Sequence, residues 1–220
     1  MSELSLPAEA YLLACDVERE RLPDRRRAAL LVRAAALTDL VLRGLVADAD
    51  GRPVVSGGGR TGHLVLDDLL AELAADPHRK WRQWVRRDAR GTLQSLEAQL
   101  DAAGVITLRT SHVLGLVPRR RPVVRDRAVV QRLRALVRDA VDGTTPASRI
   151  DPRTAALTAL VAAAELNTVV SRRDRRRARA RLDELGERAG AAVPALHKVL
   201  REVRAARSAA VATASGGGGG

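Results

Sequence analysis

Arginine is the side chain whose number and spacing point most clearly to chemistry in this chain of 220 residues. The chain has 38 Lys and Arg against 26 Asp and Glu, a formal net charge of +12, and its only lysines are Lys80 and Lys198. Guanidinium groups bind phosphate through paired hydrogen bonds. We therefore expect an anionic partner: nucleic acid, phosphate or a lipid surface.

The arginines form four clusters, within residues 25–33, 79–90, 119–127 and 172–181. Part of this positive charge can be explained without an anionic partner. A GC-rich genome favours Arg over Lys, so codon usage contributes to the arginine count. The last cluster also fits a solvated helix face.

Two tryptophans stand inside the second arginine cluster. Trp81 and Trp84 are three residues apart, which places them on one side of a helix. Trp is amphipathic and is enriched at membrane–water interfaces, so Trp beside Arg suits a lipid head group. The alternative is packing in the core, which we favour for Trp84 and leave open for Trp81.

Other kinds of site have little support. Gly57–Gly62 contains G-x-G-x-x-G, but its strand belongs to a hairpin and not to a βαβ unit, so we expect a turn before a helix. The single cysteine, Cys15, excludes a disulfide framework, and we expect it to be buried. No catalytic triad or nucleophile elbow is visible. The histidines are scattered and not at metal-ligand spacing: His63, His78, His112 and His197. We expect no enzyme activity, cofactor or metal.

Hydropathy and charge also indicate whether the chain contains a transmembrane helix or a signal peptide. The sequence has no stretch of 18 uncharged apolar residues, so we expect no transmembrane helix. The segment from Met1 to Arg21 is acidic, unlike a signal peptide. We therefore expect an intracellular protein.

The core must be aliphatic, because Phe is absent and aromatic residues are 1% of the chain. This favours packed helices over a sandwich. We predict a mainly α fold: a single compact helical domain over residues 4–207 with two small β-hairpins, and a disordered Gly-rich tail over residues 208–220.

The predicted helices follow from helical spacing of apolar residues. Asp24 is the expected N-cap and Gly44 the expected C-cap of the helix between them. The helix ranges are Leu6–Ala14, Arg25–Arg43, Leu64–Ala75, Arg79–Ala103, Asp126–Val141, Pro152–Leu166, Arg172–Glu187 and Pro194–Ala206.

Two hairpins are also predicted. The first spans residues 45–55 and turns at Asp50-Gly51. The second has strands over 105–108 and 113–117, a turn over Arg109–His112 and an end at Pro118.

Several segments together resemble the Golgi phosphoprotein 3 family, in order and spacing over about residues 4–206. The matching segments are Leu4–Leu13, Leu40–Gly44 (L-A-L-R-G in the family), Thr61–Asp68 (T-G-D-x-L-L-D-E, with His63 for the acid), Trp84-Val85, Leu100–Ile106 and Asp151–Leu157.

The resemblance implies a helical peripheral membrane protein on the cytosolic face. Eukaryotic members bind phosphatidylinositol 4-phosphate at the Golgi and act as adaptors that retain glycosyltransferases. The arginine bias suggests a bacterial homologue, on the inner face of the plasma membrane or in the cytoplasm, with another anionic lipid as ligand. Protein clients are further expected partners.

The resemblance also implies site residues. The head-group site carries over onto Arg33 and Arg90, with Trp81 and Arg87 beside them. Two family positions depart from the pattern, because Leu93 stands for an arginine and Asp24 for a tryptophan. The family's hairpin, at about residues 105–117, implies self-association through Arg109, Thr110, Ser111, His112, Leu114 and Leu116.

Two alternatives stay open from the residues alone. A helix over Arg79–Ala103 followed by a hairpin is similar to a winged-helix layout that binds nucleic acid, although few aromatics are present for base stacking. The other is a self-associating scaffold without a specific lipid ligand.

Overall fold

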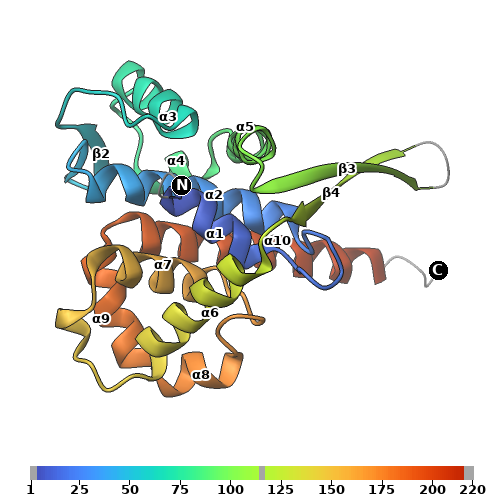
Figure 1. Ribbon diagram of the computed structural model, residues 1–220. Coiled ribbons are helices and arrows are strands. Elements are labelled where there is room, and N and C mark those ends of the chain that lie inside the picture. Colours follow the sequence, from blue (N-terminus) through green and yellow to red (C-terminus); the bar gives the residue numbers. More distant parts are fainter. Residues whose placement is uncertain (1–3, 114–116, 216–220) are drawn as a thin grey trace.

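The computed structural model describes residues 4–113 and 117–215, and the side chains among them except at 110–120 and 207–215. Helices dominate this part of the chain, as predicted (Figure 1). The helices are α1 (Leu6–Ala14), α2 (Arg25–Leu42), α3 (Leu64–Ala75), α4 (Trp81–Arg86), α5 (Ala89–Ala102), α6 (Arg127–Asp142), α7 (Pro152–Ala163), α8 (Arg172–Arg177), α9 (Arg179–Ala189) and α10 (Ala192–Ser215), with a 3-10 turn, η1 (Ala147–Arg149).

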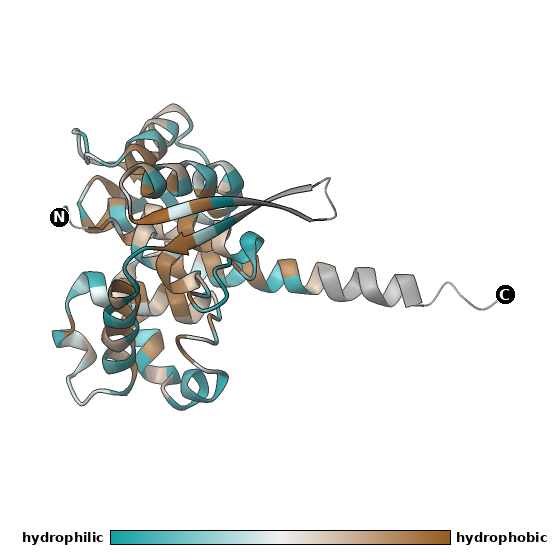
Figure 2. Ribbon diagram, turned by 45° about the vertical axis from the view of Figure 1, so that its right-hand side comes forward, coloured by the Kyte–Doolittle hydropathy of each residue, from teal (hydrophilic) through white to brown (hydrophobic). Residues whose placement is uncertain are grey.

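Helix α2 is the centre of the core. It packs against α1, α5, α7 and α10, and 13 of its 18 residues are buried. The predicted caps are confirmed: the Asp24 carboxylate accepts a hydrogen bond from the Arg27 amide over 2.9 Å, and Gly44 has a φ of +70° after the last turn. The buried residues are mostly Ala, Leu and Val, which is the aliphatic core expected of this composition (Figure 2).

The first hairpin forms where it was predicted. Strands β1 (Val46–Ala49) and β2 (Arg52–Val55) pair antiparallel and are joined by Asp50-Gly51. Both turn residues have positive φ, +52° and +76°, as a type I′ turn requires.

The second hairpin is longer than predicted. Its strands are β3 (Ile106–Val113) and β4 (Val117–Val124), and they extend away from the helices (Figures 1 and 2). The turn predicted over Arg109–His112 is wrong, because these residues belong to β3. Pro118 does not end the hairpin either: it pairs with His112 inside a two-stranded ribbon, where each strand is an edge that tolerates proline.

Two predicted long helices are each divided in two. The helix predicted over Arg79–Ala103 becomes α4 and α5, because Asp88 adopts a left-handed φ of +43°. The helix predicted over Arg172–Glu187 breaks at Ala178 into α8 and α9. The helix before β3 is thus α5 alone, and the long helix of the winged-helix alternative is not formed.

Two helix ends also differ from the prediction by three residues or more. Helix α7 stops at Ala163, three residues early, because Glu165 turns into the left-handed region. The backbone of α10 continues to Ser215, beyond the predicted Ala206 and into the segment expected to be disordered from residue 208. Over the described residues, we find no helix that combines the length and the apolar character needed to cross a membrane.

Candidate functional site

The corner between α4 and α5 orients the arginines of the second cluster. The Asp88 carboxylate caps α5 by accepting a hydrogen bond from the Gly91 amide over 3.2 Å. A Cβ on residue 91 would lie 2.3 Å from an Asp88 carboxylate oxygen, so any other residue here would displace this carboxylate from the cap. The sharp turn at Asp88 places Arg87 before α5 and Arg90 in its first turn.

Arg33 lies inside the protein, below this corner. Its side chain donates hydrogen bonds to the carboxylate of Glu72 over 2.5 Å and to the Thr92 hydroxyl over 2.9 Å, and it is only 1% exposed. It also donates a second hydrogen bond to Glu72, of 3.4 Å, and one of 3.3 Å to the backbone carbonyl of Trp84. The Arg33 guanidinium is therefore committed to internal partners that link α2, α3, α4 and α5.

Both tryptophans pack in the core. Trp84 is fully buried, and Trp81 is 4% exposed. The indole N–H of Trp81 donates to Asp48 over 2.5 Å, which attaches α4 to the first hairpin. The structure therefore places Trp81 in the core, which is the alternative that the sequence left open.

Arg87 and Arg90 are the exposed members of the predicted head-group set. The Arg87 guanidinium lies 5.3 Å from the centre of the Trp84 ring, and Asp76 accepts its hydrogen bond over 3.2 Å. Arg90 makes no side-chain hydrogen bond or ion pair with any residue the structure describes. This corner thus presents to solvent one oriented guanidinium and one that has no partner among the described side chains.

Neighbouring cations on α4 are already paired. Arg82 and Arg86 both donate to the carboxylate of Glu202 on α10, over 2.8 and 2.5 Å. These two bonds join the exposed side of α4 to the long C-terminal helix. The single carboxylate of Glu202 neutralises only one of the two positive charges that it faces.

The model of the family Golgi phosphoprotein 3 (GPP34) matches residues 6–203 of the chain. The chain belongs to this family. Among curated proteins, none matches it. Family membership agrees with the resemblance drawn from the sequence segments, and it fits the helical fold with two hairpins.

The two residues that differ from the family resemblance, Leu93 and Asp24, both make contacts inside the protein. Leu93 is 2% exposed, in the core, and Asp24 caps α2. Next to them, fully buried Glu97 accepts two hydrogen bonds from Arg25, of 2.9 and 2.6 Å. The Tyr11 hydroxyl donates a third, of 3.0 Å.

This Tyr11–Glu97–Arg25 cluster was not predicted from the sequence. Burial disfavours the charged guanidinium of Arg25, but the hydrogen bonds and charge of Glu97 outweigh it and raise the Arg25 pKa. Burial also raises the pKa of the Tyr11 hydroxyl. The only signal in the sequence was Glu97 on the apolar side of a helix.

The predicted self-association residues lie on the long hairpin. Arg109 is opposite Arg121 in the register, and its side chain is 67% exposed, with Glu20 at 3.7 Å. Thr110, Ser111 and His112 belong to β3, but their side chains are not described. Leu114 and Leu116 lie outside the described residues.

Proposed function

We propose that this member of the Golgi phosphoprotein 3 family is a peripheral membrane protein that binds anionic phospholipid head groups through Arg87 and Arg90. The observation that carries the proposal is Arg90, an exposed guanidinium with no partner among the described residues, beside Arg87 held on the Trp84 ring. By family resemblance, the lipid is phosphatidylinositol 4-phosphate or a related anionic lipid, and the protein is an adaptor for protein clients at the cytosolic face.

Electrostatics supports a reversible attachment. A basic residue near an anionic membrane contributes about 1 kcal/mol, so a few arginines hold a protein on the surface without inserting it. Arg90 contributes fully, because no ion pair within the described residues has to be broken. Salt weakens the attraction, since the charges are exposed.

Arg33 has a different part in this proposal from the one expected. It does not meet the lipid but holds α4 and α5 in place through Glu72, Thr92 and the Trp84 carbonyl. Trp81 likewise fixes α4 on the first hairpin through Asp48. Both act as positioning residues for Arg87 and Arg90.

Liposome co-sedimentation tests the proposal, with neutral vesicles, generic anionic vesicles and vesicles that contain phosphatidylinositol 4-phosphate. We expect salt-sensitive binding to anionic vesicles and about a fivefold loss for Arg90→Ala. Arg149→Ala is the matched control, because Arg149 is also exposed but lies on η1, which packs against α9. Equal binding to neutral and anionic vesicles, or equal losses in the two variants, would contradict the proposal.

A second candidate function is self-association through β3–β4. This ribbon has two strands, so each has an edge whose backbone groups are not paired within the sheet. Arg109 and Arg121 are register partners, so an Asn-Gly turn can join them and replace residues 110–120. We expect sedimentation velocity to show an oligomer for the parent and a monomer for this variant. A monomeric parent, or an unchanged mass, would exclude the idea.

A further inference from the structure

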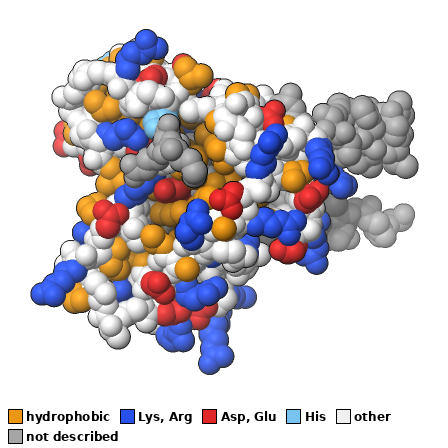
Figure 3. Space-filling model, in the orientation of Figure 1, with side chains coloured by type: hydrophobic (Ala, Val, Ile, Leu, Met, Phe, Trp, Pro, Cys, Tyr) orange, Lys and Arg blue, Asp and Glu red, His pale blue; other side chains and the backbone are white. Residues whose placement is uncertain are grey.

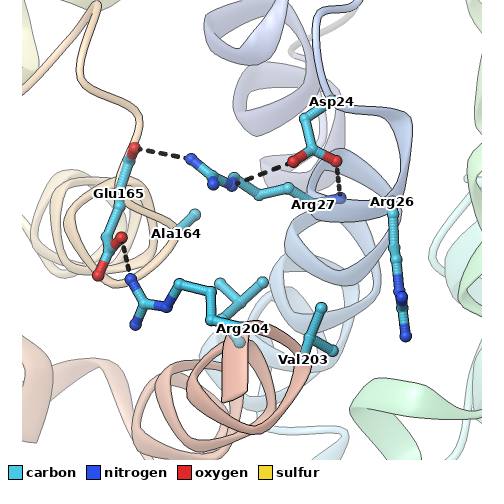
Figure 4. Close-up of a pocket in the computed structure, with 8 residues that line it drawn as sticks. Asp24, Arg26, Arg27, Ala164, Glu165, Val203 and Arg204 are labelled. Atoms are coloured by element: carbon cyan, nitrogen blue, oxygen red, sulfur yellow. Dashed lines mark hydrogen bonds and ion pairs between the residues drawn. The ribbon is translucent and has the colours of Figure 1, made fainter. Parts of the chain in front are cut away.

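A second group of arginines lies around one residue, Glu165, on a part of the protein that the proposed lipid site does not use. Glu165 follows α7 and faces α2, α8 and α10. Its carboxylate accepts a hydrogen bond from Arg204, and its backbone carbonyl accepts one from Arg27 over 3.2 Å. Figure 4 shows Arg27 and Arg204 approaching Glu165 from two different helices.

Glutamate is an unusual residue at this position. The Glu165 amide bonds to the Ala162 carbonyl over 3.0 Å, and the next amide bonds to Val161 over 3.2 Å, which is the Schellman arrangement that ends many helices. The residue at this point of the motif is usually glycine, and Glu165 has the left-handed φ of +53°. A carboxylate at the negative end of a helix is also unfavourable. A side chain that costs stability in two ways points to a role for the carboxylate.

Positive charge exceeds negative charge on the side of Glu165 that faces α2 and α10, whereas the groove on its other side carries Asp183 and Glu187 beside Arg175 and Arg179. The cavity beside Glu165 is lined by three arginines, Arg26, Arg27 and Arg204, against two carboxylates. On its other side Arg175 is oriented by hydrogen bonds to the Val170 carbonyl and the Asn167 side chain, of 2.6 and 2.9 Å. Figure 3 shows further blue side chains gathered over α8, the helix that carries Arg175.

Space beside Glu165 allows its carboxylate to move. The cavity between Arg27 and Arg204 has a volume of about 20 Å³, room for about one water molecule. Glu165 also lines a groove of about 800 Å³ between α7, α9 and α10. A larger anion can therefore bind to the arginines only if the Glu165 side chain turns into the groove. The groove has room for this side chain.

We propose that Arg27, Arg175 and Arg204 form a binding site for a phosphate monoester, in which Glu165 is the resting counterion of Arg204 that the phosphate displaces. Asp24, 3.6 Å from the Arg27 guanidinium, keeps its ion pair with Arg27 in this site. A phosphate presents more acceptor oxygens than a carboxylate and carries nearly two charges at neutral pH, so it pairs with several guanidinium groups at once. The site lies apart from Arg87 and Arg90, which belong to the corner of α4 and α5. It is open to a monoester in solution or on a lipid head group, since the recognised chemistry is the same.

Titration calorimetry with glycerol 3-phosphate, and co-sedimentation with vesicles that contain phosphatidic acid, test this inference and separate the two sources. We expect Glu165→Gln to tighten binding about fivefold and Arg204→Gln to weaken it about fivefold, the range of a partly exposed ion pair. Glu165→Gly gives a second, independent variant, because glycine suits the left-handed φ and also removes the carboxylate.

Arg149→Gln is the matched control, because Arg149 is exposed on η1 and belongs to neither proposed site, so it should leave the affinity for glycerol 3-phosphate unchanged. A weakened affinity in Arg90→Gln, with none in Arg204→Gln, would place the ligand at the α4–α5 corner and overturn the inference. Absence of binding by the parent and by both Glu165 variants would also overturn it. Neither result bears on whether Arg90→Ala reduces binding to anionic vesicles, so the two proposals fail separately.

Discussion

Arg33 and Glu72 form an ion pair of 2.5 Å in which the arginine side chain is 2% exposed and the glutamate side chain 32% exposed. The pair joins the central helix α2 to α3. The arginine also lies 5.8 Å from the centre of the buried Trp84 ring. A residue that the family resemblance connects with lipid has thus become part of the scaffold.

Replacement of this buried arginine should therefore destabilise the fold. Arg33→Ala removes four hydrogen bonds, opens a cavity and leaves Glu72 without its main partner, so we expect a loss of about 3 kcal/mol of unfolding free energy. Urea denaturation measures this loss. Arg149→Ala, at an exposed position, should change it by less than about 0.5 kcal/mol. Equal stability of Arg33→Ala and the parent would exclude the scaffold role.

Gly91 should be required for the corner that presents Arg87 and Arg90. A methyl group at this position meets the Asp88 carboxylate at 2.3 Å and displaces the cap of α5, so Gly91→Ala should cost about 1–2 kcal/mol. A thermal melt gives the comparison with Gly58→Ala. Gly58 has nothing within 4 Å of an added Cβ and no positive φ, so its melting temperature should stay near that of the parent. Similar shifts in both variants would contradict this account of the corner.

Cys15 should be unreactive in the folded protein. Burial among apolar neighbours raises the pKa of its thiol to about 12. Because the thiolate is the reactive form, labelling by iodoacetamide at pH 8 should be slower than for an exposed cysteine by about a thousandfold. The rate should recover in 6 M guanidinium chloride. Equal labelling rates with and without denaturant would show that the thiol is accessible.

Acid should weaken the contacts around Glu165. Burial opposes ionisation of this carboxyl, but the hydrogen bond from Arg204 and the nearby arginine charges outweigh it and lower the pKa of Glu165. A carboxyl whose folded pKa is lowered stabilises the fold above its unfolded pKa of about 4.5, and this contribution is lost as the pH falls through the folded value.

Urea unfolding of the parent and of Glu165→Gln across pH 3–7 tests this sign. The difference in stability between them should be largest near pH 7 and shrink towards pH 3, since glutamine does not titrate. Burial lowers the pKa of His197 on α10, and the charge of Glu165 opposes that shift, so both proteins carry His197→Gln to remove its titration from the comparison. A difference that is constant with pH would mean that the ion pairs of Glu165 contribute nothing measurable.

The sequence by itself determined the broad fold of this protein. The absence of Phe and the spacing of Ala, Leu and Val led to an aliphatic helical core, because helical periodicity is a local property of the chain. Asp24 and Gly44 marked the two ends of α2 for the same reason, since capping depends on a few neighbouring residues. The resemblance to the Golgi phosphoprotein 3 family also followed from short sequence motifs in a fixed order.

Local patterns were less reliable where the backbone takes a left-handed conformation. Asp88 and Glu165 each end a regular stretch with positive φ, at positions where glycine would have been the visible signal. The long strands of the second hairpin were missed for another reason. Arg and Pro occupy much of β4, and both are tolerated there because the sheet has two strands and each strand is therefore an edge.

The tertiary structure alone decided which arginines are available to an anion. In the sequence, Arg33 and Arg90 are equivalent members of basic clusters. The fold buries the first against Glu72, 39 positions away, and leaves the second without a partner among the described residues. It also gathers Arg27, Arg175 and Arg204 around Glu165 from four separate segments. The residue type fixes the charge of a side chain, so the sequence shows it. Its burial and its counterion depend on residues far apart in the sequence, which only folding brings close to it.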